Sequence, residues 1–177
     1  MDATHKHKVI SSSVLKNFGM LVTITDVENG FQKGMVLKSV DSGLYWEVQE
    51  RILFSEKEIK FEGETETRIH TNIRNIDKVQ NEFDKNIFEY KIKPIGHNEK
   101  PEVNDFLVFT VTVAVRIPLE IIDIYEDYLL LKINEDDTGI LHKKYINNKI
   151  AKIGDYVCHC EHRFHDLVDK NGNFIYR

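Results

Sequence analysis

Apolar and polar side chains alternate with a period of two along much of this chain. Within residues 44–54, Trp46 and Val48 fall on one face of an extended chain, and Glu47 and Arg51 fall on the other. One apolar face and one polar face are typical of a half-buried strand. Comparable segments predict further strands at residues 21–25, 36–40, 67–74, 88–92, 119–124, 128–133 and 156–160. The pattern therefore predicts a protein built mainly from strands.

Residues 106–115 form the most hydrophobic segment. Phe109 and Val111 fall on one face, and Val108 and Thr110 fall on the other, so both faces are apolar or small. Such a run predicts a central strand that is covered on two sides. Pro118 follows it and is the expected boundary between a first domain at residues 9–116 and a smaller module at residues 117–177.

Other segments depart from the strand pattern. Residues 55–66 are highly charged and predict an exposed hairpin arm, and residues 75–83 carry the spacing of one helical turn. Leu141, Tyr145, Ile146 and Ile150 have helical spacing and predict a short helix. Residues 1–8 resemble a frayed tail.

Composition supports the β-rich interpretation. The chain has 177 residues but only three alanines, and it is rich in Ile, Val, Phe and Tyr. Alanine favours helices, whereas β-branched and aromatic residues suit a pleated surface. The expected fold is mostly β: an antiparallel barrel or sandwich, followed by a smaller β-rich module with one short helix.

A glycine-containing turn between two predicted strands carries a family resemblance. Val27, Gly30, Gly34 and Met35 match a stretch that opens the second domain of elongation factor Tu and related translation β-barrels. A later family pattern ends in Gly-Asp, and Asn104 takes the place of that glycine here. Asparagine tolerates the left-handed conformation, so the replacement is mild.

That resemblance covers residues 9–110 and implies a closed barrel used as a docking surface. The family's arginine-glycine pair before the first strand is replaced by Asn17-Phe18-Gly19, which is a departure. The resemblance implies no GTPase activity, because the chain has no Gly-x-x-x-x-Gly-Lys-Ser/Thr phosphate loop.

Charge and hydropathy limit the classes of partner that we expect for this protein. The chain has 24 basic and 29 acidic residues and a formal net charge of −5, which argues against a general nucleic-acid binder. It has neither an apolar secretory leader nor a stretch of ~20 apolar residues, so we expect a cytoplasmic protein of bacterial type with no membrane contact. Lys143, Lys144, Lys149 and Lys152 form the one basic cluster, and they are the candidate binding residues. A solvated helix face is the ordinary interpretation of such a cluster.

One short segment holds metal-ligating residue types. Cys158, Cys160, His162 and His165 could hold zinc with two thiolates and two imidazoles. However, Cys-x-Cys on a flat strand separates the sulfurs by roughly 6.5–7 Å, and the usual second pair is absent. The ordinary interpretation is a half-buried strand with surface histidines.

These observations favour binding over catalysis. We expect a protein–protein interaction module that docks a basic partner, because a small acidic protein is attracted to positive charge. An immunity-type protein that masks a basic toxin is one concrete version. A small metal-dependent protein or enzyme using the segment from Cys158 to His165 is one alternative. An RNA- or ribosome-associated β-barrel is another.

Overall fold

The computed structural model describes residues 5–52, 87–110, 117–147, 150–159 and 164–177. The chain divides into two compact units, Met1–Phe109 and Thr110–Arg177. The predictions made for residues 55–66, 67–74 and 75–83 lie outside the described residues.

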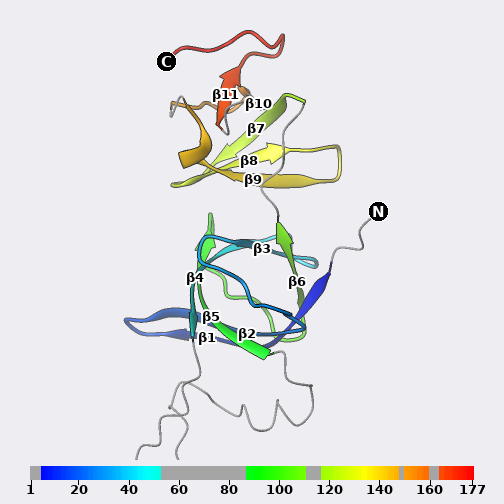
Figure 1. The fold of residues 1–177 in the computed structure, drawn as a ribbon, viewed down its shortest axis with the longest axis vertical. Coiled ribbons are helices and arrows are strands. Elements are labelled where there is room, and N and C mark those ends of the chain that lie inside the picture. The colour runs from blue at the N-terminus through cyan, green and yellow to red at the C-terminus, as the bar shows by residue number, and fades with distance from the viewer. Residues whose placement is uncertain (1–4, 53–86, 111–116, 148–149, 160–163) are drawn as a thin grey trace, which may run out of the picture. The chain divides into compact units, whose positions relative to one another are not determined.

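The first unit is a closed antiparallel barrel of six strands, drawn from blue to green in Figure 1. Its strand order is β1-β2-β5-β4-β3-β6. The strands are β1 (Lys6–Leu15), β2 (Gly19–Thr25), β3 (Val36–Ser39), β4 (Tyr45–Ile52), β5 (Ile87–Ile95) and β6 (Phe106–Thr110). The predicted all-β architecture and the barrel that the family resemblance implies are both confirmed at this level.

Alternation places the apolar side of each strand inside the barrel. Trp46 and Val48 on β4 pack with Tyr90 and Ile92 on β5, and all four are fully buried. In contrast, β6 does not have two covered faces, since Leu107 is buried while Phe106 is 40% exposed. A strand in a closed barrel has only one face inside, so the second face of Phe106–Thr110 lies outward. Residues 111–115 of the predicted strand lie outside the described residues.

Within the barrel, the strand β1 is the element that the sequence pattern does not predict. It begins at Lys6 rather than after a frayed tail, and its residues His7 and Val9 are buried. Asn104 has φ 72°, so it adopts the left-handed conformation that asparagine tolerates.

A conformationally demanding loop joins β2 to β3 and crosses the barrel end. Gly30 has φ 75°, and a Cβ there would lie 2.8 Å from Arg51 Nη1 and 2.9 Å from Tyr90 Oη. The next residue, Phe31, is buried in the core and donates its backbone N–H to Tyr90 Oη at 2.6 Å. Only glycine fits this close approach of the loop to the barrel.

The second unit is a five-stranded antiparallel sheet that curls into a half-barrel. Its order is β11-β10-β7-β8-β9, with a single 3-10 turn, η1 (Lys143–Tyr145), after β9. The strands are β7 (Leu119–Ile124), β8 (Tyr128–Lys132), β9 (Thr138–His142), β10 (Tyr156–His159) and β11 (His165–Val168). Leu129, Leu131, Leu141 and Leu167 fill its core.

The short helix expected around residues 141–150 is only the turn η1. Leu141 belongs to β9, and both Leu141 and Ile146 are buried in the same core. A strand followed by one turn therefore directs two apolar side chains inward at a spacing that also suits a helix.

Replacing Tyr90 by phenylalanine tests how the β2–β3 loop is held. Tyr90→Phe leaves the buried N–H of Phe31 without its acceptor, so we expect the free energy of unfolding to fall by about 1–2 kcal/mol. Urea denaturation measures the loss, and hydrogen exchange should show faster exchange of the Phe31 amide. Tyr176→Phe, at a side chain that is 90% exposed, is the matched control and should change little. Unchanged protection of the Phe31 amide would contradict this role.

Candidate functional site

Aromatic and basic side chains gather around η1 in the second unit. The set joins Tyr128 at the start of β8, His142 at the end of β9, and Lys143, Lys144 and Tyr145 of η1, and we call it the η1 surface. Tyr128 and His142 are directly paired across the β8–β9 ladder. Their ring centroids lie 4.8 Å apart, and those of His142 and Tyr145 lie 6.2 Å apart.

His142 organises the start of the turn. Its Nδ1 accepts the backbone N–H of Lys144 at 3.0 Å, which caps η1. With Nδ1 accepting, a neutral imidazole carries its proton on Nε2. The ring is half-buried and rests on Tyr128, which is only 4% exposed, so Tyr128 supports the site from beneath. Tyr145 and Lys144 are exposed.

The β7–β8 turn fixes the position of Lys143. Its backbone N–H donates to the Asp127 carbonyl at 2.8 Å, and its Nζ donates to the Glu126 carbonyl at 2.9 Å. The Lys144 ammonium instead lies 5.0 Å from the centroid of the Tyr145 ring. One cation, Lys144, is thus held over an aromatic ring, and Lys143 is held on the adjacent turn. Exposed rings can stack bases, and cations near them can contact phosphates.

The structure divides the predicted lysine cluster. Lys143 and Lys144 belong to the η1 surface, whereas Lys149 lies outside the described residues. Lys152 precedes β10, where its backbone N–H donates to Asp155 Oδ2 at 2.9 Å. The sequence predicts a role for the lysines but not for Tyr128 and His142. These two residues are 14 positions apart in the sequence and become neighbours only because β8 pairs with β9.

The predicted zinc ligands are only partly described. Cys158 is half-buried on β10 and His165 is buried on β11, while Cys160 and His162 lie outside the described residues. In the β10–β11 register Cys158 faces Asp166 and His159 faces His165, so Cys158 and His165 occupy opposite faces of the ladder. Among the described residues, no three His, Cys, Asp or Glu side chains could hold a metal ion. The zinc site of Cys158, Cys160, His162 and His165 therefore stays a prediction.

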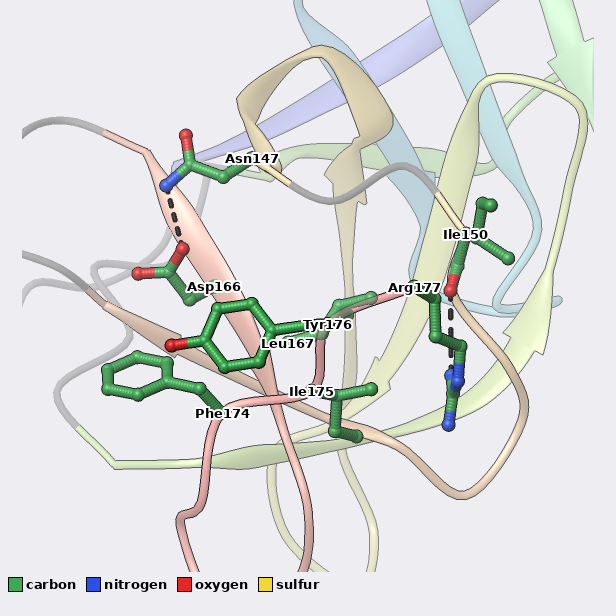
Figure 2. Close-up of a pocket in the computed structure, with 8 residues that line it drawn as sticks. All are labelled: Asn147, Ile150, Asp166, Leu167, Phe174, Ile175, Tyr176 and Arg177. Carbon is green, nitrogen blue, oxygen red and sulfur yellow. Dashed lines mark hydrogen bonds between the residues drawn. The ribbon is translucent and has the colours of Figure 1, made fainter.

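A groove of about 740 Å³ lies between the end of η1, β11 and the chain that follows β11 (Figure 2). Asn147 Nδ2 donates to Asp166 Oδ1 at 2.7 Å on its polar side. Phe174 and Tyr176 contribute two rings, 57% and 90% exposed, and Arg177 forms an ion pair with Asp155 at its far end. No sequence pattern predicts this groove.

Glu89 is a buried carboxylic acid in the first unit. It is 5% exposed, and its strand neighbours across β2 and β4 are Thr23 and Ile52, neither of which is charged. Its Oε2 has no hydrogen-bond partner among the described residues. Burial raises the pKa of Glu89 to about 7. A buried acid with a shifted pKa is a reason to look for an active site, but these two neighbours supply no acid–base partner.

No family model, curated protein or solved structure matches this chain. In the described residues, no helix is long and apolar enough to cross a membrane.

Replacing Glu89 by glutamine should change how stability depends on pH. The folded protein holds this proton up to about pH 7, whereas the unfolded chain releases it near pH 4.5. Stability is therefore lost as the pH rises from 4.5 to 7, by at most about 3 kcal/mol, and the loss persists above pH 7. Glu89→Gln mimics the neutral acid, so it should stabilise the protein at pH 8 and have little effect at pH 4.

Urea denaturation at several pH values checks this. The matched control is Glu50→Gln, an exposed carboxylate on the adjacent strand β4. An equal effect of both substitutions at pH 8, or no pH dependence for Glu89→Gln, would show that burial of Glu89 is not the cause.

Proposed function

We propose that this protein binds single-stranded nucleic acid through the η1 surface of its second unit. The observation that carries the proposal is the continuous run of rings from Tyr128 through His142 to Tyr145, with Lys143 and Lys144 beside it. Unpaired bases stack on aromatic side chains, and stacking is worth about 1–3 kcal/mol per base. His142 and Tyr145 supply the accessible rings, and the two ammonium groups supply contacts to phosphate.

Strand topology supports the same function. In chain order the five strands of the second unit lie in the sequence 5-4-1-2-3, with antiparallel neighbours. A parallel bridge between Ile146 and His165 links the end of the third strand to the fifth. This arrangement resembles the OB-fold, a partly open five-stranded barrel whose second and third strands bind oligonucleotides. Those strands correspond to β8 and β9, which carry Tyr128 and His142.

Charge sets the expected character of the binding. A chain with net charge −5 cannot rely on a broad basic face. Two lysines neutralise about two phosphates, so the logarithm of the binding constant should fall with the logarithm of salt concentration at a slope of about −1.4. Stacking therefore carries most of the affinity, which makes the proposed binding weakly dependent on salt and on sequence.

The barrel of the first unit is compatible with this proposal. Its resemblance at Val27, Gly30 and Gly34 is to translation barrels, so an RNA- or ribosome-associated role is the version of the proposal that we favour. Docking of a basic protein, the function expected from the net charge, is the second candidate, and the groove along β11 favours it.

Ring substitutions on the η1 surface test the proposal. Binding of fluorescein-labelled 12-nucleotide uridine and deoxythymidine oligonucleotides is measured by anisotropy at several salt concentrations. Tyr145→Ala and His142→Asn should each weaken binding at least about fivefold, because each removes a stacking face. Asparagine keeps an acceptor for the Lys144 N–H, so His142→Asn preserves the cap of η1. Comparison of the two oligonucleotides separates RNA from DNA preference.

Matched controls lie elsewhere in the same unit. Lys170→Ala removes a lysine from the β11 hairpin, and it should leave binding unchanged, whereas Lys144→Ala should weaken it. Failure of the wild-type protein to bind either oligonucleotide at 50 mM salt, or equal losses for Lys144→Ala and Lys170→Ala, would refute the proposal.

A further inference from the structure

The groove beside β11 has two unused hydrogen-bond acceptors. Asn147 Nδ2 donates to Asp166 Oδ1, which leaves Asp166 Oδ2 and Asn147 Oδ1 without partners among the described residues. Both atoms belong to exposed or half-buried side chains at the groove wall. The groove therefore presents acceptors, and a complementary ligand must bring donors.

Aromatic faces form the second feature of the groove. Phe174 and Tyr176 lie with their ring centroids 6.4 Å apart and are exposed to solvent. Figure 2 shows both rings near Asp166, and Leu167 and Ile175 also line the groove. Exposed aromatic rings attract cations through their faces and cover the apolar stem of a long side chain.

The uncompensated charge among the described residues of the groove is negative. Its only described cation, Arg177, makes two hydrogen bonds to the Asp155 carboxylate, and this contact lowers the pKa of Asp155. The Arg177 charge is thereby offset within the protein. Asp166 is left as the uncompensated charge among the described lining residues, so the groove attracts cations and repels phosphates.

We propose that this groove binds an arginine side chain from a basic segment of a partner protein. A guanidinium group is planar, so it can lie on Tyr176 while its N–H groups donate to the Asp166 carboxylate. A lysine ammonium has no plane to stack and is more strongly hydrated. The net charge of −5 brings such a segment to the surface. This proposal uses residues separate from the η1 surface and goes beyond nucleic-acid binding.

Binding of labelled tetra-arginine and tetra-lysine peptides to the full chain tests the proposal. We expect tetra-arginine to bind about fivefold more tightly, and Asp166→Asn and Tyr176→Ala each to weaken it about tenfold, in anisotropy titrations at constant salt. Tyr176 is 90% exposed, so its replacement leaves the fold intact. Asp136→Asn, in the exposed turn after β8, removes the same charge elsewhere, and Tyr145→Ala removes a ring from the η1 surface. Both should bind tetra-arginine as the wild type does.

Three results would overturn the assignment. Equal losses for Asp136→Asn and Asp166→Asn would mean that net charge, and not the groove, attracts the peptide. Loss of oligonucleotide binding in Tyr176→Ala would mean that the groove takes a base. A concentration-dependent dimer that Tyr176→Ala dissociates would mean that a second copy occupies it. Failure of oligonucleotide binding alone leaves this proposal standing, because the peptide titration does not depend on it.

Discussion

Closure of the first barrel depends on one strand, β1, which must pair on both of its sides. Its first residues pair with β6 and the rest pair with β2, and the register shifts between Val9 and Ser11. Such a bulge bends a strand, which lets one strand serve two neighbours. Val9 lies at the junction, where its N–H donates to the Asp105 carbonyl and its carbonyl accepts the Asn104 N–H, both at 2.9 Å. Without this strand the sheet would have two unpaired edges.

The sequence predicts the strands that bury one regular face and misses the strand that closes the barrel. Trp46 and Val48 alternate with polar residues, so β4 is recognisable from the chain alone. By contrast β1 contains the serine run at residues 11–13, and its outward positions are polar without a regular apolar counterpart. The strand β1 is buried because it pairs with segments distant in the sequence, such as β6. Local periodicity does not predict contacts of this kind.

The same limit applies to the η1 surface. The sequence identifies Lys143 and Lys144 because they are adjacent, but it gives their neighbour His142 no special role. That role exists because β8 and β9 place Tyr128 opposite His142, and because the imidazole then accepts the N–H that starts the turn. One side chain thus links the sheet, the cap and the exposed surface. The helical spacing of Leu141 and Ile146 predicts a longer helix. The structure instead has the end of β9 followed by η1, and both side chains pack in the same core.

Opposite charge requirements separate the two proposed surfaces of the second unit. A phosphate chain needs the cations of η1. Among its described residues the groove beside β11 has one cation, Arg177, which is paired with Asp155. If Arg177 were not paired, it would repel the same guanidinium group that Asp166 attracts. The Asp155–Arg177 pair joins the chain after β11 to the start of β10, and it also affects the charge of the groove. It offsets a positive charge in the groove. In the two proposed roles, this pairing would separate a surface for a polyanion from a groove for a basic segment on one small sheet.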